Sequence, residues 1–113
     1  MNKALFTATT IFLLFSCNTN KLTPVCDGST PTYEGEVEAI MMQSCSSTTS
    51  CHGTGCNKHR GELTTYAQVK ASVDEGDFQK HVLVKQNMPK GSTLTQDEIN
   101  IIQCWINSGA TEK

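Results

Sequence analysis

The stretch Cys45-Ser46-Ser47-Thr48-Thr49-Ser50-Cys51-His52-Gly53 organises this chain and decides its fold. It holds two cysteines with five residues between them, and a histidine follows the second cysteine directly. A helical pattern leads into Cys45 from the N-terminal side. Residues 53–64, with three glycines among polar residues, predict a loop on the other side. The sequence therefore presents two thiols and an imidazole between a helix and a loop.

The order of two cysteines and a directly following histidine is the one that attaches a c-type haem. The cysteine sulfurs add to the haem vinyl groups, and the histidine ligates the iron from one side. The usual spacer has two residues, whereas this one has five. We expect Ser46 to Ser50 to bulge outward as a polar loop while both sulfurs reach their vinyl groups. If Cys45 fails to react, Cys51 and His52 would hold the haem by one thioether and one ligand.

Helical periodicity marks two segments before the C-terminal region. The first runs from Tyr33 to about Ser44, and its early glutamates suit the positive end of the helix dipole. The second runs from Thr65 to Glu75, with Gly76 as its stop. Residues 78–84 predict either a helical turn or an extended segment. The two apolar faces comprise Val37, Ile40, Met41 and Ser44 in the first segment, and Tyr66, Val69 and Val73 in the second.

The last helix has the clearest signals. Thr95 is its N-cap, Glu98 completes a capping box, and Leu94 with Ile99 forms a hydrophobic staple. Gly109 ends it. A wide apolar arc follows the cap and comprises Ile99, Ile101, Ile102, Trp105 and Ile106, with Cys104 at its edge.

The first residues predict export and lipidation. Lys3 and the apolar run that follows it are typical of a signal peptide spanning residues 1–16, too short to cross a bilayer as a stable helix. The run ends at Leu14-Phe15-Ser16-Cys17, which resembles the lipobox of bacterial lipoproteins. This resemblance implies cleavage before Cys17 and acyl chains on it, which hold a protein firmly on a membrane. The alternative is a secreted protein with a coincidental cysteine.

The mature chain is short and weakly acidic. Residues 17–31 are rich in Asn, Thr, Ser, Gly and Pro and predict a lipidated tether, so that the domain spans residues 32–113. The formal net charge is −2, and removal of Lys3 with the signal peptide makes it −3. Nucleic acid is not an expected partner, because the chain has no basic patch to neutralise phosphates.

Met88 stands in a Met-Pro-Lys-Gly loop that can present its side chain inward. A thioether is a soft iron ligand, and a Met/His pair raises the reduction potential. Alternatively, Met88 fills a gap in the core, as most methionines do. His59 and His81 lie next to charged residues and are expected to face solvent, although either could replace Met88 as the sixth iron ligand.

Together these features resemble the mono-haem class I cytochrome c family. The shared order is an N-terminal helix, a Cys/Cys-His site, a Met-Pro-x-Gly loop and an amphipathic C-terminal helix with an aromatic residue. The run from Met88 to Ala110 is particularly similar to small cytochrome lipoproteins of the Bacteroidetes type. The resemblance covers roughly residues 26–110. It implies an all-α fold of three or four short helices and long loops around one haem.

The resemblance also implies a set of residue roles. Cys45 and Cys51 would carry the thioether bonds of a single haem c, with His52 and Met88 as axial ligands. Ile40, Ile102 and Trp105 would contact the haem edge where the terminal helices cross. The relatives' Cys-Asp-Gly and Cys-Trp sequences match Cys26 and Cys104, which favours a Cys26–Cys104 disulfide. Pairing of Cys56 with Cys104 is the alternative.

The function implied is electron transfer rather than catalysis. The protein would be a periplasmic or cell-envelope cytochrome held by its lipid, with the outer membrane favoured by Asn18. Its partners would be reductases, oxidases or other cytochromes that dock transiently. A haem peroxidase or gas sensor would require Met88 not to bind. The other classes are a Cys₃His zinc site of Cys45, Cys51, Cys56 and His59, and a haem-free lipoprotein stapled by disulfides such as Cys45–Cys51.

Overall fold

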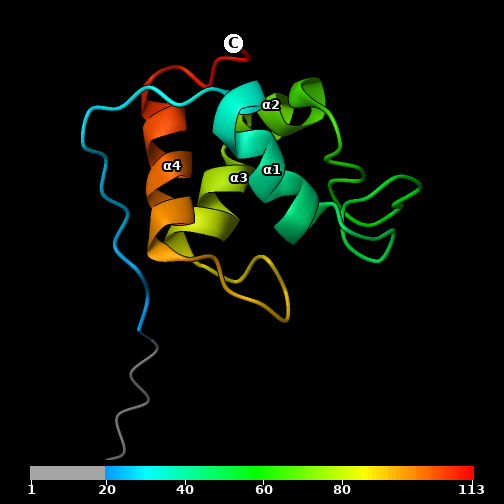
Figure 1. Ribbon diagram of the computed structural model, residues 1–113. Coiled ribbons are helices and arrows are strands. Elements are labelled where there is room, and N and C mark those ends of the chain that lie inside the picture. Colours follow the sequence, from blue (N-terminus) through cyan, green and yellow to red (C-terminus); the bar gives the residue numbers. More distant parts are fainter. Residues whose placement is uncertain (1–19) are drawn as a thin grey trace, which may run out of the picture.

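The computed structural model describes residues 20–113, which fold into helices joined by long loops (Figure 1). The predicted signal peptide and the predicted lipidation site, Cys17, lie outside the described residues.

The first helical segment runs without interruption into Cys45. It consists of the wide π-helical turns η1 (Tyr33–Val37) and η2 (Met41–Cys45), with α1 (Glu38–Ile40) between them. Thr32 caps its start, because the Thr32 hydroxyl oxygen accepts a hydrogen bond from the backbone N–H of Gly35. The predicted helix is therefore confirmed, with its end one residue later than expected. Val37, Ile40 and Met41 on its predicted apolar face are buried.

The second helical region is a pair of helices that meet at Gly76. Helix α2 (Tyr66–Asp74) begins with a complete capping box between Thr65 and Gln68. Gly76 has a left-handed backbone (φ 81°) and turns the chain into α3 (Asp77–Gln79), which continues as the π-helical turn η3 (Lys80–Val84). The residues whose conformation the sequence left open are thus helical.

Helix α4 (Gln96–Asn107) matches its sequence prediction closely. Both hydrogen bonds of the capping box between Thr95 and Glu98 are present, and Leu94 and Ile99 are buried. At the other end, Gly109 has φ 102°, and the backbone N–H groups of Gly109 and Ala110 donate to the carbonyls of Ile106 and Trp105, which satisfies these two carbonyls.

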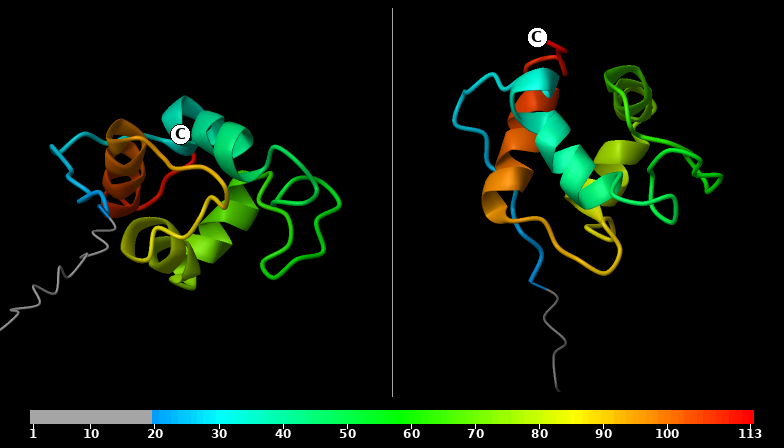
Figure 2. Two further views of the ribbon diagram at one scale, coloured as in Figure 1. Left: turned by 90° about the horizontal axis from the view of Figure 1, so that it is seen from below. Right: turned by 45° about the vertical axis from the view of Figure 1, so that its right-hand side comes forward.

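Helix α4 packs against both the first helical segment and η3 (Figures 1 and 2). Trp105 is fully buried at this junction, and its ring lies 6.1 Å from the ring of Tyr33. The structure is all-α across residues 20–113, with four α-helices and no strand. Ile40, Ile102 and Trp105, which the resemblance places at the haem edge, are buried in the apolar core and line neither of the two cavities beside the spacer.

A disulfide joins Cys26 to Cys104 in α4, as the resemblance implied. The N-terminal segment before it runs along the outside of α4 (Figure 1). Within the described residues, no helix is both long enough and apolar enough to cross a bilayer.

Candidate functional site

The five-residue spacer folds into a closed loop at the end of the first helical segment. The backbone N–H of His52 donates to the carbonyl of Cys45 at 2.9 Å, so the chain returns to its starting point after the second cysteine. Thr48 closes the loop from inside, because its carbonyl accepts hydrogen bonds from the N–H groups of Cys51 and Gly53 at 3.1 and 2.9 Å. The long spacer thereby brings Cys45 and His52 together.

The outward bulge predicted for the spacer is correct for four of its five residues. The side chains from Ser47 to Ser50 are exposed. Ser46 is the exception, because it is only 7 % exposed and its hydroxyl donates to the carbonyl of Leu63 at 2.6 Å. Ser46 thus ties the start of the loop to the segment that leads into α2.

His52 is half-buried and has one ring nitrogen engaged. Its Nδ1 lies 2.8 Å from the carbonyl oxygen of Gly61, which fits a protonated Nδ1 that donates to this oxygen. The backbone carbonyl of His52 accepts from the N–H of Leu63 at 2.8 Å. With Nδ1 held in this way, Nε2 carries the free lone pair and is the nitrogen available to a metal.

Met88 reaches the same place from the loop between η3 and α4. A cavity of about 440 Å³ opens beside the spacer, a size within the range of about 300–1,000 Å³ typical of ligand pockets. The Met88–Pro89 peptide bond, at one wall of the cavity, is cis. The cavity is lined by Ser44, Cys45, Ser50, Cys51, His52, Lys58, His59, Met88, Pro89 and Lys90. All four predicted haem-binding residues therefore line one cavity.

A smaller cavity of about 130 Å³ adjoins it and shares Cys45, His52, His59 and Met88 with it. Its remaining wall includes the buried apolar side chains of Leu63, Phe78 and Val82 from the core. The sulfur and imidazole groups thus lie against apolar side chains on this side and against lysines on the other.

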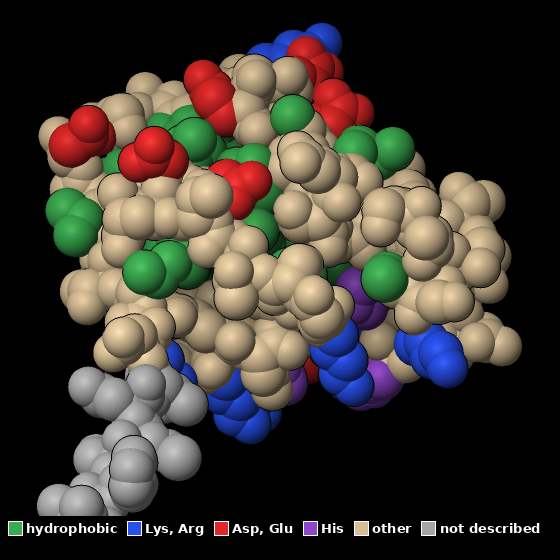
Figure 3. Space-filling view, turned by 60° about the horizontal axis from the view of Figure 1, so that its bottom comes forward, with side chains coloured by type: hydrophobic (Ala, Val, Ile, Leu, Met, Phe, Trp, Pro, Cys, Tyr) green, Lys and Arg blue, Asp and Glu red, His purple; other side chains and the backbone are tan. Residues whose placement is uncertain are grey.

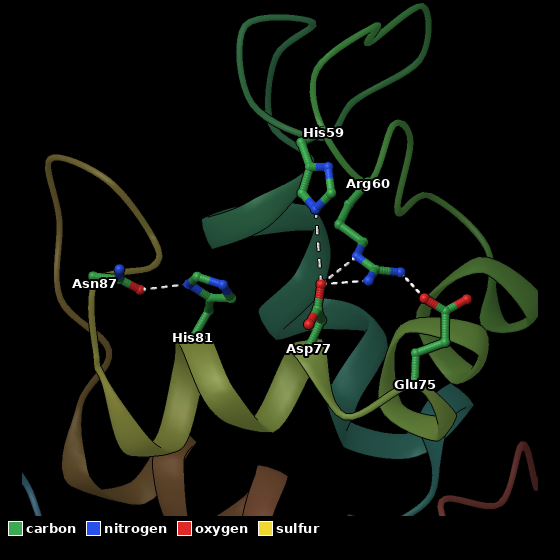
Figure 4. Close-up of polar contacts among 6 residues, drawn as sticks. All are labelled: His59, Arg60, Glu75, Asp77, His81 and Asn87. Atoms are coloured by element: carbon green, nitrogen blue, oxygen red, sulfur yellow. Dashed lines mark hydrogen bonds and ion pairs between the residues drawn. The ribbon is translucent and has the colours of Figure 1, made fainter.

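Figure 4 shows the polar groups at the edge of the smaller cavity. Arg60 pairs with Asp77 and Glu75, and its hydrogen bond is the main reason why the pKa of Asp77 is lowered. His59 is exposed, as predicted, with Nε2 3.8 Å from Asp77. His81 is partly exposed, and its Nδ1 lies 2.9 Å from Asn87 Oδ1 in an exposed contact.

Cys45, Cys51 and Cys56 are all free thiols. Burial raises the pKa of Cys45 to about 11, and the neighbouring Cys51 and Glu98 act in the same direction. Cys45 is therefore a neutral thiol at pH 7 and a weak nucleophile as it stands. Cys56 is buried and its thiol donates to the carbonyl of Cys51 at 2.6 Å. Neither the predicted Cys45–Cys51 disulfide of the haem-free alternative nor the Cys56–Cys104 pairing is present.

The proposed zinc ligands are not gathered. Across residues 20–113, the one trio of His, Cys, Asp or Glu whose ligand atoms all lie within 4.8 Å of one another is Cys26, Asp27 and Cys104. Two of these are joined in the disulfide and have no thiolate to offer. A Cys₃His site would require a different arrangement of the spacer and the following loop.

The donor set fits a covalently attached haem. Two thiols, an imidazole with a free Nε2 and a thioether line one cavity, and the adjoining cavity adds an apolar wall. Sequence reasoning missed two groups that shape this site, the Gly61 carbonyl and the Arg60 guanidinium. The glycine content of residues 53–64 predicts a loop but does not indicate which carbonyl turns toward His52.

No protein-family model matches the chain, and neither a curated protein nor a solved structure shows significant similarity to it.

Proposed function

We propose that this protein is a membrane-tethered electron-transfer cytochrome that carries one covalently attached haem with His/Met axial ligation. The observation that supports it most is the convergence of Cys45, Cys51, His52 and Met88 on one cavity. Met88 follows His52 by 36 residues along the chain. Local sequence does not bring two such distant side chains together, whereas a shared ligand would use both.

Each residue has a distinct role in this proposal. Cys45 and Cys51 would form the thioether bonds, and the hydrogen bond from the backbone N–H of His52 to the carbonyl of Cys45 compensates for the long spacer by closing it. His52 is the proximal ligand through Nε2. Its Nδ1 hydrogen bond to the Gly61 carbonyl holds the ring orientation and increases the basicity of the ligand. Met88 would supply the thioether sulfur as the second iron ligand.

When bound, the haem iron supplies a one-electron redox couple. Met88 favours the reduced state of such a couple, because a soft thioether ligand with histidine raises the reduction potential. With His52 and Met88 both holding the iron, no position would remain for a substrate, and the protein would act as an electron carrier rather than an enzyme. The all-α arrangement, with α4 against the first helical segment, supports a class I cytochrome c fold around the haem.

The partners we propose are reductases, oxidases or other cytochromes of the periplasm or cell envelope. Lipid on Cys17 holds the protein on a membrane, with the outer membrane favoured. The cavity between the spacer and the Met88 loop is where the haem edge would reach the surface. Redox partners would dock there through the small interfaces typical of electron-transfer complexes, which bury less than about 1,200 Å².

Potentiometric titration of wild-type protein and methionine variants tests this function. The protein is produced with a cytochrome c maturation system and titrated between its oxidised and reduced states. Wild-type protein should show one reversible one-electron couple and the weak far-red band of sulfur-to-iron ligation. Met88→Leu should lose that band and shift the couple to a lower potential. Met42→Leu is the matched control, since Met42 is 50 % exposed and lies outside the site.

An unchanged far-red band and potential in Met88→Leu would show that Met88 is not the ligand. If His59 or His81 were the iron ligand instead, the wild-type protein would have a low reduction potential, and Met88→Leu would not change that potential. Absence of any reversible couple would rule out the electron-transfer function itself.

A further inference from the structure

Residues 21–26, which the sequence assigns to a tether, are hydrogen-bonded to the folded domain along their length. Gln86, whose backbone is left-handed (φ 50°), forms two hydrogen bonds to the backbone of Leu22 at 2.9 and 2.6 Å. The Cys26–Cys104 disulfide closes the far end of the segment. Three further hydrogen bonds hold the same segment: Lys21 Nζ to Val84 O, Gln96 Nε2 to Thr23 O and Val25 N to Asn100 Oδ1.

This attachment leaves little chain between the domain and its lipid. Cys17 and Lys21 are four residues apart, and four residues span at most about 14 Å when fully extended. A free tether of residues 17–31 would allow the domain to take any orientation on the membrane. A domain held at Lys21 must instead turn the surface around Lys21 toward the membrane that carries the lipid.

That surface is basic. A cavity of about 390 Å³ lies beside the attached segment, is lined in part by Lys21 and Lys85, and shares Met88 with the candidate haem cavity. The haem cavity in turn is lined by Lys58 and Lys90. All four lysines are exposed, and no Asp or Glu lines either cavity. We call these four lysines the lysine face.

The charge is unevenly distributed over the molecule. The whole chain has a formal net charge of −2, yet the lysine face carries four positive charges without a carboxylate among the lining residues. In Figure 3 most of the visible Lys and Arg side chains lie along the lower edge with the histidines, whereas Asp and Glu lie mainly on the opposite edge. An anionic partner would therefore meet the lower edge.

We propose that the lysine face lies on the anionic headgroups of the membrane that holds the lipid. This inference rests on the lipidation of Cys17 in the proposed function. Lysines within a Debye length of an anionic bilayer each contribute about a fivefold preference for the bound orientation. The short chain keeps Lys21 within about 14 Å of Cys17, so the lysine face can settle onto the headgroups without unfolding the attached segment. The haem cavity then lies beside the bilayer, so the redox partners that dock there approach along the membrane surface rather than from the bulk periplasm.

Acetylation footprinting of the lipidated full chain tests this orientation. The protein is reconstituted in vesicles of phosphatidylcholine with or without phosphatidylglycerol, treated with a water-soluble acetylating reagent, and analysed by mass spectrometry. Lys21, Lys58, Lys85 and Lys90 should react severalfold more slowly on the anionic vesicles than on the neutral ones. Lys113 is the internal control, because its side chain is 78 % exposed and it lies at the C-terminus.

A double variant, Lys85→Gln with Lys90→Gln, should restore the acetylation of Lys21 and Lys58. Each lysine contributes about a fivefold preference for the membrane-bound orientation, so removing two of them weakens that preference about 25-fold. Lys113→Gln should leave the protection unchanged. Acetylation of Lys21, Lys58, Lys85 and Lys90 at the same rate on anionic and neutral vesicles would overturn the proposal.

The test separates this proposal from the proposed function. Intact mass reports the lipid on Cys17, and the visible spectrum reports the haem, independently of the footprint. A lipidated, haem-bearing protein with the same acetylation rates on anionic and neutral vesicles would overturn the orientation alone. Absence of the lipid would overturn the orientation and the membrane tether together.

Discussion

Gly53 is the residue at which the five-residue spacer has no room for a side chain. It is buried, and its N–H donates to the carbonyl of Thr48 at 2.9 Å. A Cβ atom added at Gly53 would lie 2.7 Å from the Thr48 carbonyl oxygen and 2.8 Å from that of Ser46. Both contacts are to backbone, so no side chain can rotate away. We predict that Gly53→Ala forces the loop apart.

The magnitude follows from those distances. Ordinary contacts of a Cβ atom begin near 3.4 Å, so the Thr48 backbone must move by about 0.7 Å, and overpacking of this kind costs about 1–3 kcal/mol. The shift also weakens the hydrogen bond from Gly53 to Thr48, which contributes about 1 kcal/mol. Gly53→Ala should therefore lower the free energy of unfolding by about 2–4 kcal/mol.

Urea denaturation of the purified protein measures this loss, and the yield of covalent haem in a maturation-competent host measures the effect on the site. Both should fall, because the displaced loop separates Cys45 from Cys51 and His52. Ser47→Ala is the matched control in the same loop. Ser47 is exposed, and its replacement should change stability by less than about 0.5 kcal/mol. Wild-type stability and haem yield in Gly53→Ala would refute the geometry proposed for the spacer.

Three further predictions concern stability. Cys26→Ser opens a disulfide that spans 78 residues and should lower the free energy of unfolding in urea by about 4–5 kcal/mol, an upper value from chain entropy; a loss below about 1 kcal/mol would contradict it. Tyr33→Phe should be neutral or stabilising by up to about 1 kcal/mol, because the Tyr33 hydroxyl is buried without a hydrogen-bond partner. Its matched control, Tyr66→Phe, should lower the free energy of unfolding by about 1 kcal/mol, because the Tyr66 hydroxyl donates to the backbone carbonyl of Ala110 at 3.0 Å. A larger loss of stability in Tyr33→Phe than in Tyr66→Phe would contradict both assignments. The haem-free protein should lose stability between about pH 9 and pH 11, because folding raises the pKa of Cys45 from 9.0 to about 11 and thus favours its protonated form. Urea denaturation at several pH values, with and without haem, checks this. In the haem-bearing protein of our proposal Cys45 would be a thioether and could not titrate, so the loss of stability should disappear; an equal loss in the two forms would exclude Cys45 as its source.

The helices with local signals were predictable from the sequence. The cap, the staple and the stop of helix α4 all lie in the sixteen residues from Leu94 to Gly109. Helix α2 likewise has its stop at Gly76. These features depend on residues a few positions apart, and the structure confirms them. The conformation of residues 78–84 was not decided, because so short a segment has no cap of its own and depends on packing against α4.

The features that the sequence did not predict depend on contacts between distant residues. The Ser46 hydroxyl points inward because it donates a hydrogen bond to the carbonyl of Leu63, seventeen positions away in the sequence. Gln86 holds Leu22 across 64 positions. No periodicity or spacing indicates such pairs. The Cys26–Cys104 disulfide was expected only through the family resemblance, since the cysteine count left the pairing open.

The haem is the central claim, and a pyridine haemochrome spectrum of the purified wild-type protein, produced with a cytochrome c maturation system, tests it most directly. Our account predicts a covalent haem that survives acid–acetone extraction, with the haemochrome maximum expected for two thioether bonds. A maximum typical of one thioether would leave Cys51 and His52 as the attachment and remove Cys45. A folded, colourless protein with three free thiols would contradict the account.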